Sequence, residues 1–159
     1  MQKMRVAVLR GGPSEEFDVS LKTGAGVLGA LSPSRYEPLD IVITKKGEWL
    51  LRGMVRDPRD ICNQVDVVFL ALHGSYGEDG QVQRMLDSFG VRYTGSRALP
   101  SAIAMNKVLT KDHLVQHEIR MARHMLVTQD VLGNLKGAVD AISALFGPRY
   151  IIKPVSGGS

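Results

Sequence analysis

Hydrophobic residues occur along this chain in short runs that alternate with segments in which they recur every three or four positions. The runs at residues 5–10, 39–44 and 67–72 are brief and contain β-branched residues, which is typical of buried strands. Strands that alternate with helices favour a parallel sheet with helices on its faces. The pattern therefore predicts an α/β fold with an open parallel sheet over about the first 105 residues.

Two segments of helical periodicity follow glycine-rich loops. The first has small and apolar residues at helical spacing, namely Gly24, Val27, Leu28 and Leu31. We expect Asp18 or Ser20 to cap this helix and Ser32-Pro33 to stop it. Asp79 is expected to cap the second helix and Gly90 to end it. The apolar positions of the second helix are Val82, Met85, Leu86 and Phe89.

The remaining elements before residue 120 are shorter. Residues 47–51 predict a third strand reached through a turn, and residues 54–64 predict a surface connection. A helix, or a broken pair of helices, is expected from Pro100 towards His117, because proline suits the first turn of a helix. The chain thus contains at least three strands and three helices before its character changes.

After residue 123 the pattern indicates a smaller second unit. Residues 125–127 predict a strand, a helix follows that ends at Gly147-Pro148, and residues 150–153 predict another strand. The apolar positions that predict this helix are Leu132, Leu135, Val139 and Ile142. We expect two domains, formed by residues 1–105 and 106–159.

Composition and charge exclude several classes of protein. The hydrophobic fraction of 44% and the charged fraction of 23% are those of a globular protein, so the chain is not disordered over most of its length. The 20 basic residues exceed the 16 acidic ones only slightly and are scattered, so no nucleic-acid partner is expected. The single cysteine, Cys62, cannot form an internal disulfide, and no apolar segment approaches the length of a membrane span. We therefore expect a cytoplasmic protein without membrane contact.

Polar residues with chemical potential follow two of the predicted strands. Glu15 and Glu16 lie in the loop after Arg10, and His73 and Glu78 lie in the glycine-rich loop after Leu72. Ligands of open α/β sheets bind beyond the carboxyl ends of the strands, so both loops belong to the edge where a ligand is expected. Core packing does not explain an imidazole in such a loop, although a structural histidine bonded to its own loop is an alternative.

Three other patterns have a functional and a structural interpretation. Residues 24–29 fit the G-x-G-x-x-G pattern but lie inside a predicted helix rather than at a strand-to-helix turn, so we interpret them as packing residues. His113 and His117 have the spacing of two zinc ligands but lack a third, so solvated histidines are favoured. Lys153 ends an apolar strand before a Ser-Gly-Gly-Ser loop, which suits a phosphate contact; a glycine-rich terminus is the alternative.

Five segments, considered together, carry a pattern that none carries alone. They are Leu9–Ser20, Leu70–Gly80, Tyr93–Ser96, Met105–Lys107 and Ile151–Pro154. In order and spacing these segments closely resemble the amino-terminal half of the D-alanine:D-alanine ligases, which are members of the ATP-grasp superfamily. The resemblance implies a Rossmann-like pre-ATP-grasp domain at residues 1–105 and an incomplete ATP-grasp domain from residue 106.

The resemblance also implies roles for six residues. The first D-alanine site would be formed by Glu16 near the ammonium group, Val19 lining the pocket, and His73, with Glu16 also counted as a catalytic residue. Lys107 and Lys153 would hold the phosphates of ATP, and Ser159 would be the catalytic serine of the loop that closes over them. Asn106 and Arg84 depart from the family pattern, which usually has aspartate and glycine there, but neither departure touches these contacts.

The family's activity gives these residue types a purpose. ATP phosphorylates the carboxylate of one D-alanine, and the amine of a second attacks the acyl phosphate to give a dipeptide for peptidoglycan synthesis. The resemblance implies that the ligands of Mg²⁺ lie beyond Ser159, that no metal ligand lies within this chain, and that the chain alone is inactive. It also implies a homodimer for the intact protein. Two alternatives stay open: a fragment of a ligase that prefers D-lactate or D-serine, and a complete, non-catalytic binding module for a small molecule.

Overall fold

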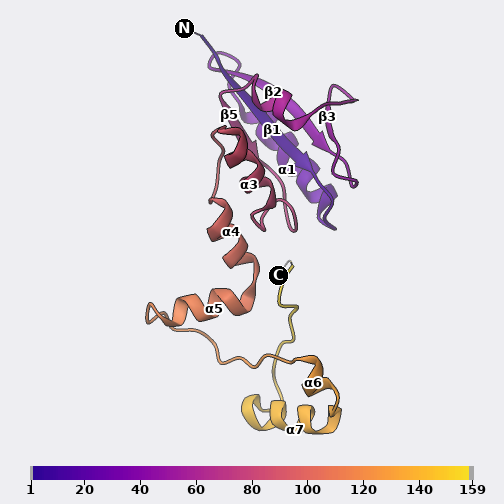
Figure 1. Ribbon diagram of the computed structural model, residues 1–159, viewed down its shortest axis with the longest axis vertical. Coiled ribbons are helices and arrows are strands. Elements are labelled where there is room, and N and C mark those ends of the chain that lie inside the picture. The colour runs from indigo at the N-terminus through magenta and orange to yellow at the C-terminus, as the bar shows by residue number, and fades with distance from the viewer. Residues whose placement is uncertain (1, 158–159) are drawn as a thin grey trace. The chain divides into compact units, whose positions relative to one another are not determined.

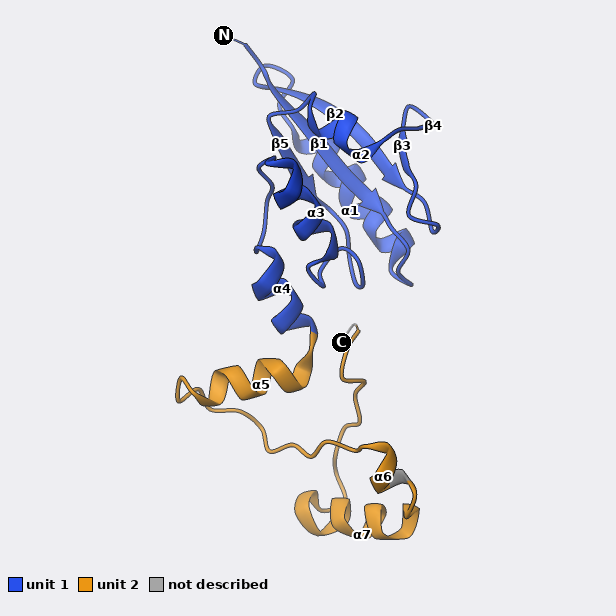
Figure 2. Cartoon of the chain, in the orientation of Figure 1, with its two compact units in different colours: residues 1–105, 158 blue, residues 106–157, 159 orange. Residues whose placement is uncertain are grey.

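The computed structural model describes residues 2–157, with Leu132 described by its backbone alone. The chain divides into two compact units, a first that ends at Met105 and a second formed by Asn106–Gly157 (Figure 2). The first unit contains the strands, which are β1 (Met4–Gly11), β2 (Tyr36–Ile43), β3 (Trp49–Leu51), β4 (Met54–Val55) and β5 (Val67–Leu70). They form one sheet in the order β4-β3-β2-β1-β5 (Figure 1).

The central strand β1 pairs in parallel with both of its neighbours. Leu9 lies opposite Ile41 of β2 and opposite Leu70 of β5. Residues 6–9 are all buried, because β1 has a neighbour on each edge and a packed layer on each face. The predicted α/β fold is confirmed, with a sheet that is mostly parallel.

The far edge of the sheet departs from the parallel arrangement of its centre. β3 runs antiparallel to β2, with Ile43 opposite Trp49, and β4 runs antiparallel to β3. The reason is the short connection between β2 and β3, in which the amide of Thr44 donates to the carbonyl of Glu48 at 2.9 Å. A turn this short permits only an antiparallel hairpin, since a parallel partner requires a long crossover.

Helices cover the two faces of the sheet and complete two hydrophobic clusters. They are α1 (Phe17–Ala30), α2 (Pro58–Cys62) and α3 (Gln81–Phe89), followed by α4 (Ala98–Met105). Val6 and Val8 of β1 belong to a cluster with apolar residues of α1, whereas Ala7 and Leu9 belong to a cluster with residues of α2 and α3. This alternation is the two-residue period of a strand buried on both faces.

Two helix starts and one additional helix differ from the predictions. α1 begins at Phe17, so Asp18 and Ser20 lie inside the helix and neither is its N-cap. α2 occupies part of the predicted surface connection, with the carboxylate of Asp57 accepting the amide of Arg59 at 2.8 Å. Asp79 lies one residue before the N-cap of α3, where it accepts the amide of Gln81 at 3.0 Å. The end of α3 at Gly90, in the left-handed conformation, is confirmed.

The second unit contains α5 (Lys107–Val115), α6 (Gln129–Leu132) and α7 (Leu135–Phe146). The broken pair of helices after Pro100 and the helix end at Gly147 are confirmed. The two predicted strands of this unit are wrong, because residues 125–127 and 150–153 pair with no strand among residues 106–157. A segment becomes a strand only where a second strand pairs with it. Ile151 and Ile152 have no such partner among residues 106–157 and are 82% and 77% exposed.

Within residues 2–157, no helix is both long enough and apolar enough to span a membrane. The longest helix, α1, has 14 residues.

Candidate functional site

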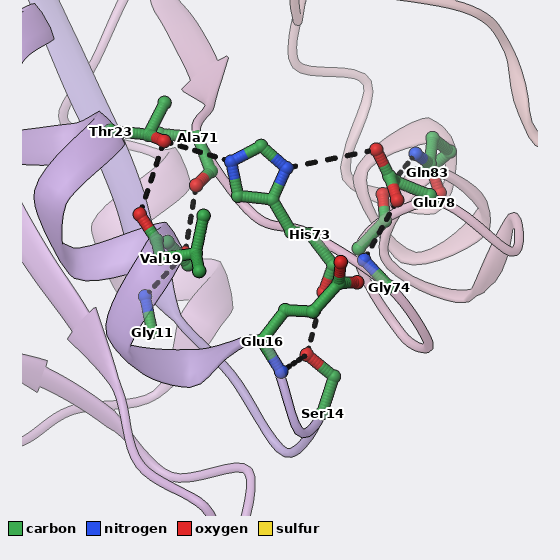
Figure 3. Close-up of polar contacts among 12 residues, drawn as sticks. Gly11, Ser14, Glu16, Val19, Thr23, Ala71, His73, Gly74, Glu78 and Gln83 are labelled. Atoms are coloured by element: carbon green, nitrogen blue, oxygen red, sulfur yellow. Dashed lines mark hydrogen bonds and ion pairs between the residues drawn. The ribbon is translucent and has the colours of Figure 1, made fainter. Parts of the chain in front are cut away.

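The two polar loops leave neighbouring parallel strands, β1 and β5, at the same edge of the sheet (Figure 3). Buried serines join them. Ser20 of α1 accepts the amide of Gly11 at 2.8 Å and donates to the carbonyl of Ala71 at 2.7 Å. Ser14 donates to the carbonyl of His73 at 2.7 Å. The two loops are therefore held together by side chains that belong to the first loop and helix α1.

Glu16, the residue before the first turn of α1, reaches across to the second loop (Figure 3). Its Oε2 lies 2.5 Å from the position that a Cβ would take at Gly74. Its own amide donates to the hydroxyl of Ser14 at 3.2 Å. Its neighbour Glu15 is exposed to solvent and forms no such contact with the second loop in the first unit as described. Of the adjacent pair of carboxylates, Glu16 is thus the one that faces the glycine-rich loop.

His73 lies between α1 and the glycine-rich loop (Figure 3). Its Nε2 is 2.8 Å from the hydroxyl of Thr23, and its Nδ1 is 3.8 Å from Oε1 of Glu78. The other carboxylate oxygen of Glu78 accepts the amide of Gly74 at 2.7 Å. The short contact with Thr23 fixes the orientation of the imidazole. The His73 side chain is 31% exposed, so it is still accessible to a small ligand.

The groups that meet at Gly74 are mainly hydrogen-bond acceptors. Glu16 lies against its Cα and Glu78 accepts its amide, so two carboxylates approach one residue, with the imidazole of His73 beside them. Carboxylates placed this close together favour a positive charge nearby. The arrangement suits a small molecule with an ammonium group.

The glycine-rich loop is shaped by contacts within itself. The carboxylate of Asp79 accepts the amides of Tyr76 and Gln81. Gln83, which is 3% exposed, donates from Nε2 to the carbonyl of Gly77 at 2.7 Å. Burial raises the pKa of the Tyr76 phenol, whose oxygen accepts the indole N–H of Trp49 at 3.2 Å. These contacts leave the loop few alternative conformations.

The other predicted site residues are placed as follows. Val19 is on α1, one turn after Glu16, and is 53% exposed. Lys107 and Lys153 belong to the second unit. Lys107 donates from Nζ to the carbonyl of Gly157 at 3.1 Å, and Lys153 is exposed. Ser159 lies outside the described residues. The structure therefore brings Glu16 and His73 to one loop pair, with Val19 on the adjoining helix.

Sequence reasoning missed Ser14, Ser20, Thr23 and Gln83. A signal existed for two of them, because Ser20 and Thr23 follow Glu16 at spacings of four and seven. Residues at these spacings share one face of a helix, and this face of α1 meets the second loop. No comparable spacing indicates Ser14 or Gln83.

Two interpretations of weaker motifs can be compared with the structure. The G-x-G-x-x-G run lies inside α1, as predicted, and a Cβ at Gly24 would meet the side chain of Arg10 at 2.5 Å. Packing does not explain the other two glycines of the run, since a Cβ at Gly26 or Gly29 would meet nothing within 4 Å. His113 and His117 are both exposed, and their ring centroids are 4.9 Å apart. Within the described part of the chain, no three or more histidine, cysteine or acidic side chains are grouped so that they could hold a metal ion.

Comparisons with known proteins identify the family of this chain. Residues 5–62 and 52–96 match the family model described as D-ala D-ala ligase N-terminus. A D-alanine--D-alanine ligase from Halothermothrix orenii is 34% identical over 181 residues, covering 100% of this chain and 53% of the relative. The chain spans about half the length of the curated relatives that it matches.

Solved structures give the same result. The D-alanine-D-alanine ligase from Coxiella burnetii matches with a TM-score of 0.82 and 26% identity, over 99% of this chain and 54% of the other. A D-Ala:D-Ser ligase from Enterococcus faecalis matches with a TM-score of 0.73 and 25% identity, over the same shares. The matched range contains the central strand, both polar loops and the residues between them. The chain belongs to the D-ala D-ala ligase N-terminus family.

Proposed function

We propose that the chain is the amino-terminal portion of an ATP-dependent ligase that joins two D-alanines for peptidoglycan precursor synthesis. The proposal concerns the whole protein, because the chain spans about half of its relatives. In it, residues 1–105 form the pre-ATP-grasp domain and residues 106–159 begin the ATP-grasp domain. The intact protein is proposed to be a cytoplasmic homodimer.

The observation that carries the proposal is the meeting of Glu16, His73 and Glu78 at the backbone of Gly74. In the proposed site, Glu16 binds the ammonium group of the first D-alanine, His73 orients it, and Val19 lines the space beside it. An amino acid held at its ammonium group presents its carboxylate in a defined direction, which is what transfer to that carboxylate requires. The rigid connection of the two loops through Ser14 and Ser20 supports this positioning role.

The lysines fit a role in holding ATP phosphates. Lys107 directs its ammonium group to the carbonyl of Gly157, in the Ser-Gly-Gly-Ser segment, and a phosphate oxygen can replace that carbonyl as acceptor. Lys153 is exposed four residues before Gly157 and is free to contribute a second positive charge. ATP, when bound, supplies the phosphoryl group that activates the substrate carboxylate. Ser159 is proposed to act in the loop that closes over this group.

Mg²⁺ is proposed as a cofactor of the whole protein and not of this portion. The chain spans about half the length of its relatives, and the proposal places the ligands of Mg²⁺ in the half that it does not span. No step in the part of the site formed by this chain depends on the metal.

A second candidate is a ligase that joins D-alanine to D-serine. The match to the D-Ala:D-Ser ligase from Enterococcus faecalis, with a TM-score of 0.73, favours keeping it. The two candidates share the first D-alanine site and differ in the amino acid that attacks. They are therefore separated by the acceptor used and not by Glu16 or His73.

The test uses the protein encoded by the whole reading frame that contains these residues. We expect D-alanine to stimulate ADP release from ATP, and L-alanine to have no effect. Glu16→Gln removes the charge that faces Gly74 and is expected to raise the KM for D-alanine by about 30-fold to 100-fold. Glu15→Gln is the matched control, since that side chain is exposed, and its KM should stay within about twofold of the wild type.

Wild-type protein that releases no ADP in response to D-alanine would refute the proposed activity. Equal effects of the two substitutions would refute the role of Glu16. Faster formation of a mixed dipeptide with D-serine than of D-alanyl-D-alanine would select the second candidate.

A further inference from the structure

Thr23 is the one side chain of α1 that contacts the imidazole of His73 in the described hydrogen-bond network (Figure 3). It lies on the helix face that also carries Glu16 and Ser20. Its Oγ1 is 2.8 Å from Nε2 of His73 and 3.1 Å from the carbonyl of Val19. Nothing in the resemblance or in the comparisons assigns it a role.

The single proton of the Thr23 hydroxyl decides how this network is arranged. If the proton points to the Val19 carbonyl, Oγ1 accepts Nε2–H, and both short contacts are hydrogen bonds. If it points to Nε2 instead, the ring must carry its proton on Nδ1, which lies 3.8 Å from Glu78 Oε1. That distance is too long for a hydrogen bond, so this arrangement keeps only one of the two bonds. The first arrangement is favoured.

Glu78 cannot easily move to close the longer distance. Its Oε2 already accepts the amide of Gly74 at 2.7 Å, while the amide of Glu78 itself donates to the carbonyl of Gly74 at 2.9 Å. Glu78 is thus held by two hydrogen bonds to Gly74, one through its carboxylate and one through its backbone amide. Nδ1 of His73 and Oε1 of Glu78, 3.8 Å apart, can both accept from one hydrogen-bond donor of a ligand placed beside them.

We propose that Thr23 is a positioning residue: its hydroxyl holds His73 as the Nε2–H tautomer, so that Nδ1 acts as an acceptor beside Glu78 for the ammonium group of a small amino acid. The tautomer does not depend on the proposed function, whereas the identity of the ligand as D-alanine rests on it. Thr23 acts through His73 and does not itself touch the substrate.

The tautomer is measured directly by NMR of the whole protein labelled with ¹⁵N in histidine, at about pH 8.5, where an ordinary imidazole is neutral. The His73 signal is identified by its loss in His73→Gln. We expect the Nε2–H pattern in the wild type and in Thr23→Ser, which keeps the hydroxyl. Thr23→Val has the same shape without it, and is expected to shift His73 towards the Nδ1–H tautomer, because nothing then accepts Nε2–H and the negative charge of Glu78 favours a proton on Nδ1.

Substrate kinetics provide the second readout. Thr23→Val is expected to raise the KM for D-alanine by about tenfold with a smaller change in kcat, and Thr23→Ser should restore it to within about twofold. Thr128→Val is the matched control, since it makes the same substitution at a threonine whose side chain forms no capping hydrogen bond. An unchanged melting temperature in Thr23→Val shows that the fold is kept.

Each outcome has a distinct meaning. An unchanged Nε2–H pattern in Thr23→Val would overturn the inference, as would identical behaviour of the valine and serine variants. A tautomer shift without any change in KM would overturn the role in substrate positioning. A tautomer shift in a protein that releases no ADP with D-alanine would support the role of Thr23 towards His73 and refute the proposed function.

Discussion

The carboxylate of Glu16 lies 2.5 Å from the point where a Cβ at Gly74 would have to be. The two residues are 58 positions apart in the sequence, yet the space that Glu16 occupies exists because residue 74 has no side chain. Gly74 also has a φ of +70°, which glycine adopts without strain. Glycine at this position therefore has two functions, one for the loop and one for the acidic side chain that faces it.

Gly74→Ala is predicted to displace Glu16 and weaken substrate binding. Gly90→Ala is the matched control, because Gly90 has a φ of +68° and a Cβ there would meet nothing within 4 Å. Both variants should lose about 1 kcal/mol of stability from backbone strain, measured by urea unfolding. Only Gly74→Ala should raise the KM for D-alanine, by about tenfold or more. Unchanged kinetics in Gly74→Ala would contradict the contact between Glu16 and the backbone at residue 74.

Ser20→Ala is predicted to destabilise the protein and loosen both loops. The Ser20 hydroxyl is fully buried and bonds the amide of Gly11 and the carbonyl of Ala71, which would both lose this partner. The expected loss is about 2–4 kcal/mol in the free energy of unfolding. Ser88→Ala is the control, since its exposed hydroxyl also donates to a backbone carbonyl at 2.7 Å, and it should cost less than about 0.5 kcal/mol. Equal losses in the two variants would refute the importance of the Ser20 bridge.

The sequence was sufficient for the parts of the site that depend on buried strands. The runs around Leu9 and Leu70 are apolar because both faces of β1 and β5 are packed, and parallel strands bring their following loops to one edge. Glu16 and His73 could therefore be predicted to lie close together. The partner of each side chain could not, because the bonds from Ser20 to Ala71 and from Thr23 to His73 depend on how α1 is rotated against the second loop.

One predicted strand forms and another does not, and the difference has a physical cause. Trp49–Leu51 and Tyr150–Lys153 both read as strands, but the sequence of a strand does not specify its partner or its direction. The first segment folds back on β2 and becomes antiparallel. The second pairs with no strand among residues 106–157, so an apolar pattern alone predicted sheet structure where the described chain has no regular element.

Gln83→Glu is predicted to destabilise the glycine-rich loop by about 3 kcal/mol. The new carboxylate would be buried, would face the carbonyl of Gly77 and could not donate to it while ionised. Because burial raises the pKa of this new carboxyl above its unfolded value, the loss should decrease as the pH falls and the group becomes protonated. Urea unfolding at several pH values measures both effects.

Gln64→Glu is the matched control for this substitution. Gln64 also donates from Nε2 to a backbone carbonyl at 2.7 Å, that of Asp60, but it is exposed. It should lose less than about 1 kcal/mol, with little dependence on pH. A similar loss in both variants would mean that the burial of Gln83 is not what makes its amide important.

The thiol of Cys62 is predicted to make the stability of the first unit depend on pH in the alkaline range. Burial raises its pKa from the ordinary value of 9.0 to about 11. Between these two values the folded chain keeps the thiol proton that the unfolded chain loses, so the free energy of unfolding should fall as the pH rises through this window.

Burial also raises the pKa of Tyr76 and Tyr93, so the thiol must be isolated by comparison with Cys62→Ala. Urea unfolding followed by the fluorescence of Trp49, which belongs to the same hydrophobic cluster, measures the difference between the two proteins. That difference should change between about pH 9 and pH 11, with the wild type losing more stability than the variant. Parallel curves for the two proteins would show that the thiol does not titrate differently in the folded and unfolded states.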